Sequence, residues 1–88
     1  MKISEEKKKK ITEQILAHLY NLNPKPIFTA HIAKELARDE EFIKKLLLNL
    51  HKKGLIVKID KNSEGIKYLK RSRWRLSDKA YEVYHKHQ

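Results

Sequence analysis

The chain has 88 residues, of which 40% are hydrophobic, and it contains no cysteine. This length predicts one domain, 1–88, with a core that forms without disulfides or thiolate metal sites. Its 21 Lys and Arg against 11 Asp and Glu give a formal net charge of +10. Such a charge favours a polyanionic partner, chiefly DNA or RNA and less often an anionic membrane. A Lys- and Glu-rich thermophilic protein would also carry many charges.

The distribution of charge helps to choose between these interpretations. Residues 1–50 carry ten basic and seven acidic side chains, whereas residues 51–88 carry eleven basic and four acidic ones. A general solubility role does not require this late excess. No apolar run approaches the roughly 18 residues that a membrane span needs, and no signal-peptide pattern opens the chain. We therefore expect a cytoplasmic protein, nucleoid-associated if prokaryotic.

The first predicted helix covers residues 4–22. Ile11, Ile15, Leu19 and Leu22 recur at helical spacing, and Asn23-Pro24 ends the pattern because proline disfavours helical geometry in the preceding residue. The N-terminal segment, 1–10, is basic, and its four consecutive lysines, 7–10, oppose the helix dipole in the first turns. We expect a solvated, fraying end, with an auxiliary phosphate contact as the alternative.

A short strand, Ile27-Phe28, is predicted to lead into a second helix, 30–37. Thr29 is the expected N-cap, because its hydroxyl can accept a hydrogen bond from the first turn. Ile32, Ala33 and Leu36 share one face of this helix. Two turns are marginal alone, so tertiary packing must hold them.

The third predicted helix, 40–53, is strongly amphipathic, with Asp39 as its N-cap and Gly54 as a left-handed C-cap position. Its buried stripe is expected to be Ile43, Leu46, Leu47 and Leu50. The opposite face presents Glu41, Lys44, Lys45, Leu48, Asn49 and Lys52.

A hairpin and a final helix complete the pattern. A strand at 55–60 and a turn at 62–65 lead to a return segment, 66–76, where Trp74 and Leu76 alternate with arginines and should face the core. Residues 61–75 carry six basic side chains and one acidic one, so the hairpin is positive. Ser77 is expected to cap a helix at 78–85 whose inner side carries Ala80, Val83 and Tyr84.

This α+β order resembles the winged helix-turn-helix domain of archaeal and bacterial transcription regulators. The resemblance covers roughly residues 10–85. The matching stretches are TAHIAKEL (29–36) and DEEFIKKLLLNL (39–50) for the helix pair, KKGLI (52–56) for entry into the wing, and WRLSDKAYEV (74–83) for the exit from it. The resemblance implies a three-helix core with a small antiparallel wing sheet and a C-terminal helix. This fold serves double-stranded DNA binding or, in other proteins, protein interaction.

The resemblance implies that helix 40–53 approaches the major groove, while the wing at 61–71 contacts the backbone or the minor groove. Lysine can bind guanine, asparagine can bind adenine, and leucine can contact a thymine methyl. The start of helix 30–37 offers backbone N–H groups to a phosphate. The expected DNA-binding residues are Thr29, His31, Lys44, Lys45, Leu48, Asn49, Lys52, Lys61, Lys67, Lys70, Arg71 and Arg73.

The first turn of helix 40–53 counts against this interpretation. Asp39, Glu40 and Glu41 stabilise a helix start but repel phosphates, although Glu41 could accept a hydrogen bond from cytosine. Phe42 and Leu48 are more apolar than a DNA face requires. A protein-interaction module of a transcription or replication assembly is therefore the main alternative, and RNA binding stays open.

No other class is supported by the sequence. The sequence contains no enzyme motif, no nucleophile paired with a base and no glycine-rich phosphate loop. We therefore expect neither catalysis nor a cofactor. The five histidines lack metal-ligand spacing, and no small-molecule pocket is evident. The terminal helices could pair in a homodimer, for which Tyr81, Val83 and Tyr84 are available.

Overall fold

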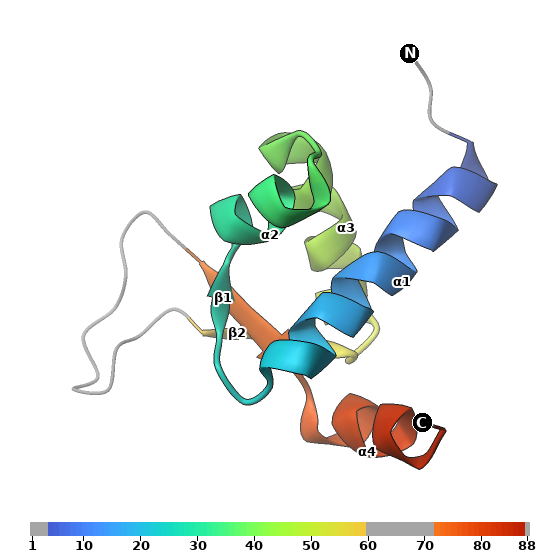
Figure 1. The fold of residues 1–88 in the computed structure, drawn as a ribbon, viewed down its shortest axis with the longest axis vertical. Coiled ribbons are helices and arrows are strands. Elements are labelled where there is room, and N and C mark those ends of the chain that lie inside the picture. Colours follow the sequence, from blue (N-terminus) through green and yellow to red (C-terminus); the bar gives the residue numbers. More distant parts are fainter. Residues whose placement is uncertain (1–3, 60–71, 88) are drawn as a thin grey trace.

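The computed structural model describes residues 4–59 and 72–87, which form four helices and one three-stranded antiparallel sheet (Figure 1). The order of elements confirms the predicted fold class. In chain order the elements are α1 (Glu5–Leu22), β1 (Ile27–Phe28), α2 (Thr29–Leu36), α3 (Glu40–Lys52), β2 (Ile56–Ile59), β3 (Arg73–Leu76) and α4 (Asp78–Lys86).

Helix α1 crosses one side of the molecule and supplies much of the core. It begins after Ser4, whose hydroxyl accepts a hydrogen bond from the Lys7 backbone N–H at 3.2 Å. Ile11, Ile15 and Leu19 are buried, as their spacing predicts. Leu22, expected as the fourth member of this stripe, is 37% exposed, because it lies at the last residue of the helix.

The sheet has the order β1–β3–β2, with β3 in the middle. Trp74 of β3 is opposite Ile27 of β1 and Lys58 of β2, and both Trp74 and Leu76 are buried as predicted. Strand β2 begins one residue later than expected. The reason is that the Leu55 N–H closes α3 by donating to the Leu50 carbonyl at 3.1 Å. The predicted turn at 62–65 and the start of the return segment lie outside the described residues.

Helices α2 and α3 form the helix-turn-helix pair. Ala37, predicted as the last residue of α2, instead ends the helix in the left-handed conformation, with φ of 54°. Asp39 caps α3 as expected, because its carboxylate accepts a hydrogen bond from the Phe42 N–H at 3.1 Å. The helix ends at Lys52, and Gly54 adopts the predicted left-handed conformation with φ of 77°.

One core joins α1, α2, α3 and the sheet. The predicted buried stripe of α3 is confirmed in full, and Leu36 and Phe42 pack against the core while partly exposed. The buried hydrophobic residues are Ile11, Ile15, Leu19, Ile27, Ile32, Ala33, Ile43, Leu46, Leu47, Leu50, Ile56, Trp74 and Leu76.

Helix α4 lies at the far end of the molecule from the α2–α3 turn, beside the C-terminal end of α1 (Figure 1). Ser77 caps it as predicted, accepting a hydrogen bond from the Ala80 N–H at 3.2 Å. The expectation that Val83 faces inward is wrong, since this side chain is 53% exposed. Tyr81 packs inward instead, because Tyr20 of α1 offers its ring a stacking partner at a centroid distance of 5.3 Å.

Candidate nucleic-acid interface

The solvent face of α3 is where five of the predicted DNA-binding residues come together. It combines three cationic side chains, one amide and one apolar side chain along a single helix. All five side chains are exposed, namely Lys44, Lys45, Leu48, Asn49 and Lys52. Such a surface can bind phosphates through the lysines while the amide and the apolar group meet base edges.

The rest of α3 fixes how this surface is presented. The opposite face buries four residues in the core, and Leu47 among them is fully inaccessible to solvent. The Asp39 cap closes one end of the helix, and the Leu55–Leu50 hydrogen bond closes the other. The exposed side chains therefore extend from a backbone that is held at both ends and along its length.

The acidic residues at the start of α3 differ in their roles. The carboxylate of Asp39 is engaged in capping, as the helix-stabilising interpretation expects. Glu40 borders a surface cleft together with Lys44, one turn further along the helix. Glu41 is exposed on the same face as the lysines. The negative charge thus stays in the first turn, and the middle and C-terminal half of the face are basic.

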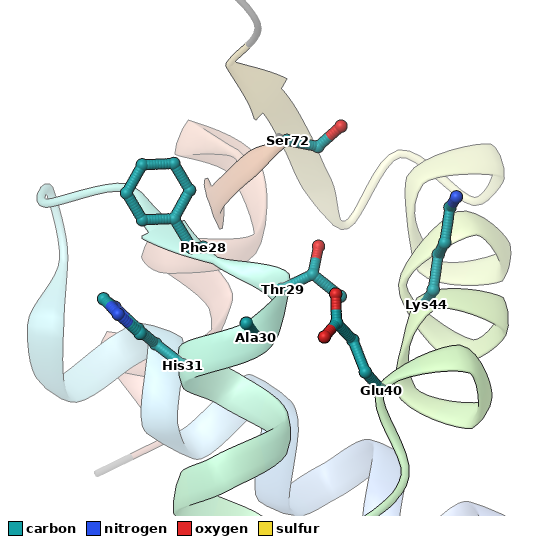
Figure 2. Close-up of a pocket in the computed structure, with 7 residues that line it drawn as sticks. All are labelled: Phe28, Thr29, Ala30, His31, Glu40, Lys44 and Ser72. Atoms are coloured by element: carbon teal, nitrogen blue, oxygen red, sulfur yellow. The ribbon is translucent and has the colours of Figure 1, made fainter. Parts of the chain in front are cut away.

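A cleft of about 350 Å³ lies where the first turns of α2 and α3 meet the start of β3. Figure 2 shows Glu40 and Lys44 extending from α3 on one side and Phe28 and His31 on the other. Thr29, Ala30 and Ser72 complete the lining. The fold thereby brings together predicted residues from two helices, Thr29 and His31 with Lys44.

Thr29 has a structural role that the sequence did not reveal. It is the first residue of α2, and the N-cap position belongs to Phe28, which has no capping side-chain hydrogen bond. The prediction of Thr29 as N-cap is therefore wrong. Its hydroxyl accepts a hydrogen bond from Trp74 Nε1 at 2.8 Å, and its N–H donates to the Ser72 carbonyl at 3.3 Å. Thr29 ties α2 to β3, while Ala30 and His31 remain exposed.

Phe28 connects the cleft to the base of the predicted wing. The His31 ring meets it edge-on at a centroid distance of 5.6 Å, and the Arg73 guanidinium lies over it at 5.7 Å. This contact fits a cation–π interaction. Phe28 carries no local signal of this role, because its neighbour Arg73 follows 45 positions later and only the β1–β3 pairing makes them adjacent.

The remaining basic residues belong to the predicted wing and to β3. Lys61, Lys67, Lys70 and Arg71 lie outside the described residues. Arg75 turns toward α4, since its Nη1 donates to the Leu76 carbonyl at 2.9 Å and lies 3.5 Å from the Asp78 carboxylate.

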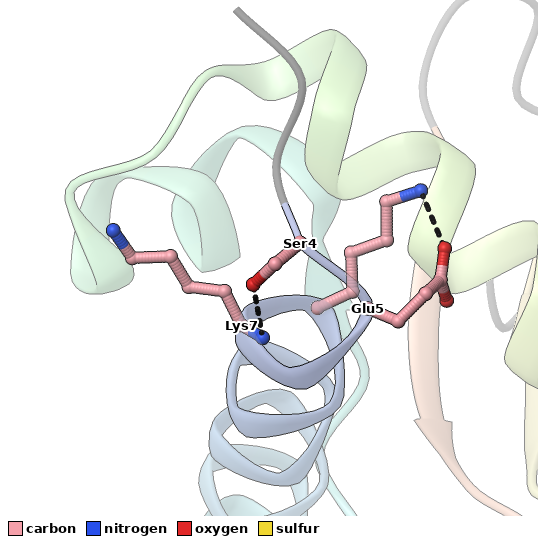
Figure 3. A network of polar contacts seen from close by, with 4 residues as sticks. Ser4, Glu5 and Lys7 are labelled. Carbon is pink, nitrogen blue, oxygen red and sulfur yellow. Dashed lines mark hydrogen bonds and ion pairs between the residues drawn. The ribbon is translucent and has the colours of Figure 1, made fainter.

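The lysine run at the start of α1 is helical from Lys7 onward. Figure 3 shows this first turn, where the Ser4 hydroxyl accepts a hydrogen bond from the Lys7 backbone N–H. The Lys8 ammonium lies 3.4 Å from the Glu5 carboxylate. Cap and ion pair both offset the unfavourable placement of cations near a helix start.

Residues 4–59 and 72–87 contain no cluster of three or more His, Cys, Asp or Glu side chains suited to a metal ion. None of their helices combines the length and apolar character needed to cross a bilayer.

No family model and no curated protein sequence matches this chain. Solved structures do match. The S. aureus MepR–DNA complex superposes with a TM-score of 0.73 at 22% identity, covering 88% of this chain and 59% of that one. A Lactococcus lactis ZitR mutant gives a TM-score of 0.70 at 23% identity, covering 99% and 55%.

A further S. aureus MepR mutant structure gives a TM-score of 0.71 at 22% identity and covers 88% of this chain. The chain spans only a little over half the length of these proteins, since its matches cover 53–59% of them. The likeness at this level of identity establishes the fold, which is a winged helix-turn-helix with α2 and α3 as the helix pair.

Proposed function

We propose that this chain is a DNA-binding domain of a transcription regulator, acting on double-stranded DNA in the cytoplasm. Helix α3 would enter the major groove with its middle and C-terminal half, where Lys45, Leu48, Asn49 and Lys52 are exposed. The acidic first turn would stay away from the phosphates. The fold that this chain shares with MepR supports the proposal, because one of the matching MepR structures is a complex with DNA.

The observation that carries the proposal is the contrast between the two faces of α3. One face buries four hydrophobic residues, whereas the other exposes three lysines and an asparagine. A helix needs only its buried face to fold, and lysines on one solvent strip repel one another weakly. Their concentration on the second helix of a helix-turn-helix pair is what phosphate and base contacts require.

Two flanking surfaces would add phosphate contacts. The exposed start of α2, at Ala30 and His31, would offer a helix N-terminus to the backbone beside the cleft. The basic segment that follows β2 would extend the contact along the backbone or into a minor groove, through Lys61, Lys67, Lys70 and Arg71. Arg73, held over Phe28, would mark the near limit of that segment.

Titration against duplex DNA over a range of salt concentrations tests the proposal. We expect binding that weakens steeply with salt. For each phosphate neutralised, the logarithm of the association constant should fall by about 0.9 for every tenfold increase in salt concentration. Single-stranded RNA of matched length serves as competitor, because preference for RNA would support the RNA alternative instead. Absence of binding at low salt, or binding insensitive to salt, would refute the proposal.

We also propose that the chain forms a homodimer through its terminal helices. Leu22 near the end of α1 and Val83 on α4 are 37% and 53% exposed. Tyr81 and Tyr84 contact Tyr20 within the same chain, so the outer face with Val83 is the surface left for pairing. Sedimentation should show a dimer that Val83→Glu weakens. A wild-type monomer at high concentration would contradict this.

A protein-interaction module is the second candidate, favoured by the exposed Leu48 and the acidic first turn of α3. Phe42 no longer supports it, because this side chain packs against the core. If Leu48→Glu abolished association with a protein partner while leaving duplex DNA binding intact, this candidate would replace the first.

A further inference from the structure

Leu48 is a large apolar side chain that the core does not use. It is 45% exposed, although Leu46, Leu47 and Leu50 on the same helix are buried. In the described part of the chain, the other exposed large hydrophobic residues are Leu22 and Val83, which belong to α1 and α4. Within α2 and α3, Leu48 is thus the exposed large hydrophobic residue.

The neighbours of Leu48 along α3 are cationic. Residues three and four apart are adjacent on a helix surface, so Lys45 and Lys44 precede Leu48 on its face and Lys52 follows it. All three lysines are exposed. A partner that fits this arrangement must offer a small apolar group surrounded by negative charge.

Thymine in duplex DNA has that combination. Its C5-methyl group projects into the major groove, and the phosphates of both strands border the groove. The core of a protein interface instead needs several contiguous apolar side chains. Leu48 offers only one, since Phe42 on the same helix packs against the core. The charge and the size of the apolar spot therefore both favour thymine.

We propose that Leu48 is a specificity-determining residue that contacts a thymine methyl, while Lys44, Lys45 and Lys52 provide affinity that does not depend on sequence. This inference rests on the proposed DNA binding and adds to it the base that the middle of α3 reads. A preference for thymine opposite Leu48 follows, independent of what the acidic first turn or the basic segment 61–71 contacts.

Deoxyuridine replaces thymine with loss of the methyl group alone, so it gives a direct test. Duplexes enriched from a random pool by the full chain are synthesised with each thymine in turn replaced by deoxyuridine. We expect the replacement to lower the affinity about three- to fourfold at one thymine per binding site, the one that contacts Leu48. This is the effect expected from losing the burial of one methyl group. Titrations at one fixed salt concentration measure the ratio of the two dissociation constants.

A double-mutant cycle that combines a protein substitution with the thymine-to-deoxyuridine replacement tests whether Leu48 makes the methyl contact. Leu48→Ala keeps helix propensity, and circular dichroism checks that the fold is retained. In this variant the thymine-to-deoxyuridine ratio should fall to about one. Lys52→Ala is the matched control on the same face. It should weaken binding to both duplexes equally, lower the salt slope by about 0.9 and leave the ratio unchanged.

The possible outcomes separate this inference from the proposed function. Equal binding of thymine and deoxyuridine duplexes by the wild type, with normal salt dependence, overturns the inference while DNA binding stands. A ratio that survives in Leu48→Ala also overturns it, because another side chain must then read the methyl group. Failure to bind any duplex refutes both. Loss of the ratio in Leu48→Ala alone supports the proposal.

Discussion

Helices α3 and α4 are both amphipathic, both capped by a side chain, and anchored in different ways. Helix α3 buries four aliphatic residues in the central core, whereas α4 has no buried residue. The aromatic contacts of α4 involve partly exposed rings: Tyr81 and Tyr84 lie against Tyr20 at centroid distances of 5.3 and 5.1 Å. His85 Nδ1 is 3.0 Å from the Tyr20 hydroxyl.

The difference separates global stability from local stability. Because the aliphatic stripe of α3 is shared with α1, α2 and the sheet, α3 should open only when the whole domain unfolds. Helix α4 packs against the core only through partly buried residues, Ala80 and Tyr81, and against Tyr20 of α1, so it can detach at lower free energy. The candidate DNA surface is thus built on the more stable of the two helices.

The largest expected effect comes from Leu47→Ala, which truncates a side chain that is 0% exposed. Loss of burial and the resulting cavity should lower the free energy of unfolding by about 2–5 kcal/mol. Urea denaturation measures it. Leu48→Ala is the matched control, since its exposed side chain should change stability by no more than about 0.5 kcal/mol. Similar losses for both would mean that α3 is not anchored as described.

Thr29→Val tests how the helix pair is joined to the sheet. The substitution preserves shape but leaves Trp74 Nε1–H without the acceptor it has at 2.8 Å, at a cost of about 1–3 kcal/mol. Trp74 is the one tryptophan of the chain, so its fluorescence reports the change directly. Thr29→Ser keeps the hydroxyl and should retain most of the stability. Equal behaviour of the two variants would argue against the hydrogen bond.

Tyr20→Leu should affect α4 selectively. It removes both aromatic contacts and the hydroxyl beside His85, and should lower the opening free energy of α4 by about 1–2 kcal/mol. Hydrogen exchange should quicken at α4 amides while α3 amides keep their protection. Leu22→Ala, on the exposed end of the same helix, is the control. Equal loss of protection in α3 would show that the two helices unfold together.

The smallest effect on stability is expected from Lys52→Gln, since this exposed side chain makes no core contact. The free energy of unfolding should stay within about 0.5 kcal/mol, but the salt slope of DNA binding should fall by about 0.9. Lys79→Gln on α4 removes the same charge from the other helix and should leave the slope unchanged. A similar reduction by both variants would place DNA contacts on α4 as well.

Much of the fold could be predicted because the signals are local. The α3 stripe, the caps at Ser77 and Asp39 and the left-handed Gly54 each depend on residues within one or two turns. Two of the errors, Thr29 as N-cap and Val83 as an inward residue, have a common cause. In both places a distant aromatic partner decided the orientation: Trp74 takes the Thr29 hydroxyl, and Tyr20 draws Tyr81 inward.

The candidate site divides in the same way. The side chains of α3 that face solvent could be predicted from the sequence, because a helix repeats every 3.6 residues and its apolar stripe defines the remaining face. In contrast, the folded chain was needed to show that Phe28 contacts both His31 and Arg73, and that a cleft forms between the first turns of α2 and α3. Those contacts depend on strand pairing and helix packing between residues far apart in the chain, which no local pattern specifies.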